Sequence, residues 1–385
     1  MTQDQIIREL LEISGLVGGD ILLAQGGGGN TSVKSDDGDR MWIKASGVRL
    51  SELKQGHGYI ETNPRIMTEA LRDQRLSTLS RTDAQLEMTQ RTQAATRDAS
   101  SMRPSIESGF HALLGRAVVH THPVYVNAFS CMQGGEQALA DVVGEPVVWV
   151  HYAPPGYALA VKVDVECAAF EKQNGQAPVE IVLANHGMIA AAASGSDAIA
   201  ATFRLVDAGK SYFGRLPSDA LAHRQPPEYL TTWAQGLVAA FKRRSARAVA
   251  ARATTRTTLF NAADEPDKWL TNGPFVPDDV VYGTHQVWEV SASVSPQVWL
   301  DREFDTLTDK MIVVIPGLGV VLAAPNQRTL DFMEEYLLAR VLTRRLIARR
   351  GHPSVLSSND TRYLEEMESE QYRQSVAATV APEEH

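Results

Sequence analysis

Cysteine is scarce in this chain, because Cys131 and Cys167 are its only thiols among 385 residues. Two cysteines far apart in sequence leave no disulfide framework and no CxxC metal site, and they favour a reducing compartment. The sequence also lacks any run of eighteen apolar residues and any basic start followed by an apolar stretch. These absences predict a soluble, cytoplasmic protein with no membrane association and no cleaved leader.

An excess of positive charge is lacking as well. The formal net charge is -9 and the pI is about 5.6, which argues against a general affinity for nucleic acid or anionic membranes. Hydrophobic residues make up 44% of the chain, and its length exceeds the usual span of one hydrophobic core. We therefore predict a catalytic domain over 1–215, a helix and linker over 216–270, and a small α/β domain over 271–385.

Hydrophobic periodicity and turn residues predict the order of helices and strands. The polar segment 81–101 is typical of an exposed helix or a mobile excursion, and 254–273 reads as a loop. Helices are predicted at 6–17, 196–214, 226–252, 327–348 and 361–378, and strands at 31–34, 41–44, 116–120, 146–152, 157–163, 179–183, 188–193, 280–290, 311–315 and 320–323.

Three histidines and one glutamate form the most informative pattern. Residues two apart in a strand project to the same side, so His120 and His122 can both face one ion. His186 follows another predicted strand, and Glu107 precedes the first. Histidines at a strand end can also serve only as hydrogen-bonding groups, but all four residues together favour a catalytic site for Zn²⁺, Mn²⁺ or Co²⁺ with an open coordination position.

Four successive glycines, followed by Asn30, form the second informative segment. Glycine backbone can bring several N–H groups close to an anion without a side chain in the way. No Gly-Lys-Ser/Thr follows, so this is not a nucleotide-binding P-loop. Nearby donors Ser46, Gly47 and Ser105 favour a phosphate or carboxylate site, and Ser105 also reads as a helix N-cap. A flexible turn without a ligand is the alternative for the glycines alone.

Five segments in order resemble the class II aldolase/adducin family, and of its members chiefly the fuculose- and rhamnulose-phosphate aldolases. They are Gly28-Gly29-Asn30-Thr31-Ser32, Lys44-Ala45-Ser46-Gly47, Pro104-Ser105-Ile106-Glu107, Val119-His120-Thr121-His122-Pro123 and Asn185-His186-Gly187-Met188-Ile189. The resemblance covers about residues 5–215. Residues 270–375 separately resemble the segment that joins aldolase and short-chain dehydrogenase halves in rhamnulose-phosphate aldolase fusions, although no dehydrogenase half follows here.

The resemblance implies a three-layer α/β/α fold around a mainly antiparallel sheet and a zinc-type aldolase activity on a sugar phosphate or sugar acid. By position, His120, His122 and His186 resemble metal ligands, and Glu107 resembles the carboxylate that alternates between ligand and general base. The residues that resemble the anion-binding group are Gly28, Gly29, Asn30, Ser46, Gly47 and Ser105, with Lys44 as a compensating charge. Cleavage would proceed through a metal-bound enediolate.

Some features depart from the family pattern. Ile106 stands where fuculose-phosphate aldolases have a second serine, and the proton-donating tyrosine that the family brings from a neighbouring subunit has no clean match, leaving His151 or Tyr152 as candidates. A decarboxylase of β-keto acids, or a non-catalytic adducin-like binding module, remains an alternative function. The family also implies a homo-oligomer, with a tetramer as the expected ring.

Overall fold

The computed structural model describes residues 1–97, 102–244, 249–271, 273–284, 286–308, 310–367 and 371. Its larger sheet has seven strands in the order β3-β2-β1-β4-β7-β6-β5. Neighbouring strands are antiparallel except for the parallel pair β5 and β6, as predicted. The strands are β1 Asn30–Lys34, β2 Met41–Lys44, β3 Tyr59–Thr62, β4 Ala117–Thr121, β5 Val148–Val150, β6 Glu180–Leu183 and β7 Gly187–Ala192.

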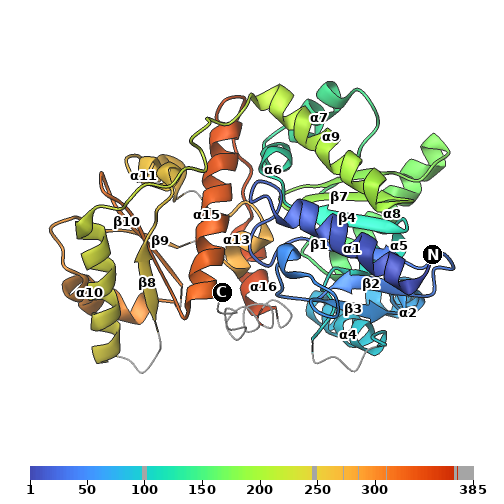
Figure 1. Cartoon of the computed structure of the whole chain (residues 1–385), viewed down its shortest axis with the longest axis horizontal. Coiled ribbons are helices and arrows are strands. Elements are labelled where there is room, and N and C mark those ends of the chain that lie inside the picture. Colours follow the sequence, from blue (N-terminus) through green and yellow to red (C-terminus); the bar gives the residue numbers. More distant parts are fainter. Residues whose placement is uncertain are drawn as a thin grey trace.

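Helices cover both faces of this sheet, which gives the three-layer arrangement visible in Figure 1. Alternate strand residues feed the two faces: Val119 joins the cluster that contains α1, α6 and α9, and Val118 joins the cluster that contains α2, α5 and α8. The helices of this part are α1 Gln3–Gly18, α2 Pro64–Leu71, α3 Gln74–Ser77, α4 Arg81–Ala94, α5 Ser108–Leu113, α6 Val124–Ser130, α7 Gly135–Val143, α8 Tyr157–Asn174 and α9 Gly195–Phe213, with a short 3-10 turn at Leu50–Glu52.

A second, four-stranded sheet has the order β8-β11-β10-β9. Its strands are β8 Ala250–Ala253, β9 Val287–Glu289, β10 Met311–Ile315 and β11 Gly319–Ala324, so the segment predicted as helix and linker supplies one strand. The accompanying helices are α10 Glu228–Arg244, α11 Thr257–Ala262, α12 Pro266–Trp269, α13 Pro277–Val281, α14 Pro296–Glu303, α15 Gln327–Ile347 and α16 Ser358–Glu366, with a 3-10 turn at Phe304–Thr306.

The long helix α15 stands between the two sheets (Figure 1). Leu330, Met333 and Leu337, spaced three and four residues apart, belong to the same buried cluster as Phe129 on α6, and α15 packs against α6. Burying each large apolar side chain of this kind contributes roughly 1.5–3 kcal/mol to the free energy of unfolding. The C-terminal region therefore shares a hydrophobic core with the larger sheet.

Several predicted elements are wrong. Residues 157–163 begin helix α8 and form no strand, 254–273 contain α11 and α12, and 280–290 hold the end of α13 and only the short strand β9. The helix predicted at 226–252 stops at Arg244, before β8. In the polar segment, α4 buries one line of side chains that includes Met88, while residues 98–101 lie outside the described part.

The predicted last helix is present from Ser358 to Glu366, and residues 368–370 and 372–378 lie outside the described part. Among the helices that the structure describes, none combines the length and apolar character needed to cross a membrane.

Candidate metal centre

Strand pairing places the first candidate ligand beside the end of the glycine loop. His120 on β4 is the direct cross-strand partner of Asn30 on β1, so their side chains project from the same face of the sheet. Phe110 on α5 contacts the His120 ring edge-on. Because Glu107 immediately precedes α5 at its N-cap position, this packing brings the glutamate to the same face.

The four residues predicted as metal ligands converge. Within the described residues, potential ligand atoms of His120, His122 and His186 all lie within 4.8 Å of one another. The Nε2 atoms of His120 and His122 are 3.1 Å apart. Glu107 Oε1 lies 3.2 Å from His186 Nε2, and its Oε2 lies 3.4 Å from His120 Nε2. One small cation could therefore contact all four side chains.

The environment suits a divalent cation because it keeps an imidazole neutral. Burial lowers the pKa of His120 to about 3, with the Glu107 charge opposing that shift. A metal ligand must be unprotonated at the donating nitrogen. His120 Nδ1 lies 2.8 Å from the carbonyl oxygen of Met188, an acceptor that holds the proton on Nδ1 and leaves Nε2 to donate its lone pair. The donor set of three nitrogens and a carboxylate fits Zn²⁺, Mn²⁺ or Co²⁺.

Asn30 fixes the position of the glutamate. Its Nδ2 donates to Glu107 Oε2 at 2.8 Å and to Ser105 Oγ at 3.0 Å, and Asn30 Oδ1 contacts His111 Nε2. His111 Nδ1 lies 2.7 Å from Ser32 Oγ, and burial holds the pKa of His111 well below its ordinary value. A neutral His111 thus sets the orientation of the Asn30 amide. Sequence reasoning missed His111, although its spacing of four from Glu107 was a usable signal.

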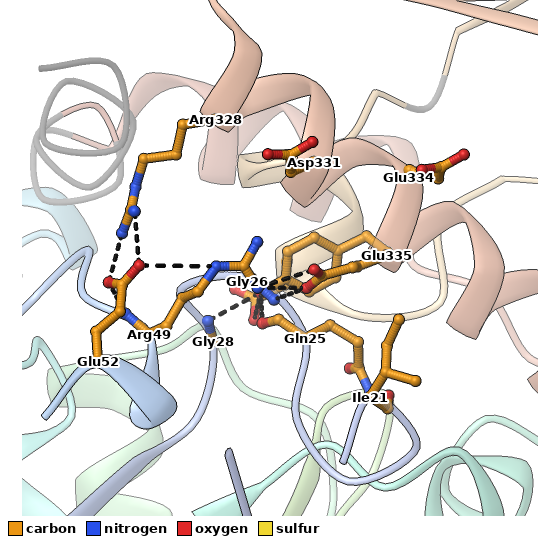
Figure 2. A network of polar contacts seen from close by, with 12 residues as sticks. Ile21, Gln25, Gly26, Gly28, Arg49, Glu52, Arg328, Asp331, Glu334 and Glu335 are labelled. Carbon is orange, nitrogen blue, oxygen red and sulfur yellow. Dashed lines mark hydrogen bonds and ion pairs between the residues drawn. The ribbon is translucent and has the colours of Figure 1, made fainter. Parts of the chain in front are cut away.

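The glycine loop is covered by the C-terminal region. Figure 2 shows Glu335 of α15 above the loop, where its Oε2 accepts from the Gly26 N–H at 2.7 Å. The Gly28 N–H donates to the Tyr336 hydroxyl at 2.9 Å. Lys44 Nζ donates to the carbonyl oxygens of Gly27, Ala45 and Val48, so its three donor positions are used within the protein.

Two ion pairs hold α15 against the segment beside the glycine loop (Figure 2). Arg49 Nη1 lies 2.7 Å from Glu335 Oε2, and Arg328 Nη1 lies 2.6 Å from Glu52 Oε1. Burial opposes ionisation of Glu52, yet hydrogen bonds from Arg328 and from the Arg49 backbone outweigh it and lower the pKa of Glu52. These contacts join residues near 50 to residues near 330, and no sequence pattern had suggested them.

Two of the other predicted anion-binding residues, Ser46 and Ser105, lie beside a pocket. Ser46, Arg103 and Ser105 line it, together with Gln85 and Thr92 of α4. Gly47 has φ +78° and Gly29 has φ +64°, a region that disfavours other residues, and a Cβ on Gly29 would meet the His120 carbonyl oxygen at 2.8 Å. Arg103 was not predicted, although it stands two residues before Ser105.

The two candidate acids occupy different environments. His151 is exposed, while Tyr152 is half-buried and packs beside Ile106 in a cluster with Val280 and Leu364 from the C-terminal region. Among the residues that the structure describes, His151 is not part of the imidazole cluster. The identity of the proton donor stays a prediction.

An α/β fold whose larger sheet brings together three imidazoles and a carboxylate that could bind a metal is typical of an aldolase-like class of protein. The chain belongs to the family described as class II aldolase and adducin N-terminal domain, which matches residues 8–213. This membership confirms the fold and the resemblance inferred from sequence, and it supports a lyase-type enzyme.

The chain is also similar to one curated protein, the uncharacterized oxidoreductase YuxG of Bacillus subtilis (strain 168), at 31% identity over 195 residues. The match covers 48% of this chain and only 26% of that protein, so the chain spans about a quarter of its length.

Solved structures match at lower similarity. The N-terminal class II aldolase domain of a conserved protein from Thermoplasma acidophilum is 24% identical with a TM-score of 0.47, covering 55% of this chain and 95% of that one. An L-fuculose 1-phosphate aldolase is 20% identical with a TM-score of 0.39, covering 57% and 93%.

Proposed function

We propose that this protein is a metal-dependent lyase that cleaves or forms a carbon–carbon bond in a sugar phosphate or a related sugar acid. The observation that carries the proposal is the convergence of Glu107, His120, His122 and His186 in one buried cluster. The family membership supports the same class of reaction. The adducin-like binding alternative has no need of such a cluster.

The three histidines and Glu107 would hold the ion, which when bound supplies a Lewis acid for the negative charge that develops on substrate oxygens. Zn²⁺, Mn²⁺ and Co²⁺ all suit these donors. The protein's own contribution is positioning, since the imidazoles come from a strand, its end and a separate loop of the sheet. Burial of all four side chains also excludes water, which strengthens electrostatic interactions there.

Glu107 would move the proton. The residue is 4% exposed, and Asn30 Nδ2 holds Oε2, so Oε1, which faces His186, would be the oxygen that exchanges the proton with substrate. Loss of a positioned general base costs about 10²- to 10⁴-fold in rate. The partner acid stays unassigned between His151, Tyr152 and a residue of another subunit in the predicted oligomer.

The anionic end of the substrate would bind in the pocket lined by Ser46, Arg103 and Ser105. Two hydroxyls and a guanidinium can hold a phosphate or carboxylate, and Arg matches the planar geometry of either. Ser105 also accepts from Asn30, which links the anion pocket to the carboxylate that moves the proton.

Product analysis tests the reaction. The metal-loaded chain is incubated with ketose phosphates, sugar acids and β-keto acids, and aldehyde or ketone fragments are trapped as hydrazones while carbon dioxide is collected. We expect carbonyl fragments from one ketose or sugar acid, and a rate about 10²- to 10⁴-fold lower for Glu107→Gln. Release of carbon dioxide together with a single ketone from a β-keto acid, with no ketose or sugar acid split into two organic fragments, would instead establish the decarboxylase, and no turnover with any class would refute a lyase.

A further inference from the structure

A carboxylate from outside the family-matched region lies against one of the candidate ligands. Asp278 stands on α13, whereas the family match ends at residue 213. Its Oδ2 is 3.1 Å from His122 Nδ1, and both side chains are almost completely buried, at 2% and 3% exposure. This contact brings the C-terminal region directly to the metal centre.

The neighbouring carboxylate, that of Asp279, stabilises the start of α13. Asp279 Oδ2 accepts from the Phe275 N–H at 2.8 Å and from the Val276 N–H at 3.3 Å, which caps the start of α13. Asp278 points elsewhere: its Oδ2 lies 3.0 Å from the Tyr336 hydroxyl. That hydroxyl has one proton and also lies 2.6 Å from the Gln25 carbonyl oxygen, so it cannot donate fully to both acceptors.

His122 needs an acceptor on its outer side. If its Nε2 binds the ion beside His120 Nε2, the neutral ring carries its proton on Nδ1. Among the described residues, His122 Nδ1 has no aligned hydrogen-bond partner, and the oxygen within contact distance is that of Asp278.

His120 offers an internal comparison. Its Nδ1 faces the carbonyl oxygen of Met188 at 2.8 Å, a neutral acceptor, whereas His122 faces a carboxylate. Carboxylates behind metal-ligating histidines fix the tautomer and make the imidazole a stronger donor, and their loss typically weakens metal binding about 10- to 100-fold.

We propose that Asp278 is a positioning residue for His122, so that the C-terminal region completes the metal centre of the larger domain within the same chain. The inference rests on the proposed metal-dependent function. It gives α13 and α15 a role in the chemistry, because Tyr336 on α15 also touches Asp278 and the glycine loop.

Metal affinity tests this role without recourse to activity. The full chain is stripped, and Zn²⁺ or Co²⁺ affinity is measured by competition with a chromogenic chelator for the wild type, Asp278→Asn and Asp278→Glu. We expect Asp278→Asn to bind metal about 10- to 100-fold more weakly, to shift the visible absorption spectrum of bound Co²⁺, and Asp278→Glu to recover part of the affinity.

Glu335→Gln is the matched control, because it neutralises a carboxylate of the same interface whose polar partners, in the part of the chain that the structure describes, are Gly26 and Arg49. We expect it to keep the wild-type affinity and Co²⁺ spectrum. Melting of the metal-free variants separates folding from positioning: a folded Asp278→Asn protein with wild-type affinity and spectrum would overturn the proposal for Asp278 alone. A wild-type chain that binds no metal would refute the proposed function itself.

Discussion

The glycine loop at 26–29 and the pocket beside Ser105 belong to one predicted anion site, but the fold treats them differently. The N–H groups of Gly26 and Gly28 in the loop donate to Glu335 and Tyr336 of α15, while Ser46, Arg103 and Ser105 line a pocket. A backbone N–H that already donates to a carboxylate or hydroxyl offers little to a substrate. A glycine-rich segment can therefore be a contact surface for another part of the same chain, as well as a ligand-binding site.

Replacing Gly28 tests the contact between the glycine loop and the C-terminal region, and it has the largest expected effect. A Cβ there would meet Asp278 Oδ2 at 2.1 Å and the Tyr336 hydroxyl at 2.5 Å. Crowding of this kind costs about 1–3 kcal/mol, so we expect Gly28→Ala to lower the free energy of unfolding by that amount in urea titrations. Gly15→Ala is the control, because among the described residues no atom beyond its own stretch of α1 lies within 4 Å of the added Cβ. Equal stability of Gly28→Ala and wild type would show that α13 and α15 do not cover the loop.

Replacing one arginine at the pocket and one beside the glycine loop tests which of the two places binds the substrate anion. Hydrogen bonds to charged groups are worth about 1.5–3 kcal/mol, so we expect Arg103→Met to raise KM for the anionic substrate at least tenfold with little change in kcat. Arg49→Met removes the arginine that pairs with Glu335 beside the loop, and we expect its KM to stay near the wild-type value. A raised KM in Arg49→Met with an unchanged KM in Arg103→Met would instead indicate that the substrate anion binds at the glycine loop.

The smallest expected effect is a loss of stability in acid from the Arg328–Glu52 ion pair, which joins α15 to the segment beside the glycine loop. The pKa of Glu52 is lowered in the folded protein from its ordinary value of 4.5. Its stabilising contribution is therefore fully present above about pH 4.5 and is lost as the pH falls through the lower folded value. We expect the free energy of unfolding to fall more steeply below this pH in the wild type than in Glu52→Gln. Parallel curves for the two proteins would argue against a stabilising Arg328–Glu52 pair.

Local patterns account for what could be predicted. Two-residue alternation placed His120 and His122 on one side, and the helix that opens the chain shows its buried face as Ile6, Leu10, Ile13 and Val17. The same reasoning failed at 157–163, where apolar residues alternate as in a strand. The buried residues Leu159, Ala160, Val163 and Cys167 follow a helical period that only the longer segment reveals.

Long-range contacts account for what could not be predicted. Asp278 stands 156 residues after His122, and nothing in its neighbourhood marks it as more than a carboxylate before an apolar run. The Arg49–Glu335 and Arg328–Glu52 pairs likewise span more than 270 residues. Such pairs depend on how α15 packs against α6, which is decided by the whole hydrophobic core rather than by a local motif.

Metal content tests the central claim most directly. The full chain is saturated with Zn²⁺, passed through a desalting column and analysed by elemental mass spectrometry beside a variant in which His120, His122 and His186 are all alanine. We predict one tightly held ion per wild-type chain and none in the folded triple variant. Equal metal in both proteins, or none in the wild type, would contradict a metal centre built from these histidines.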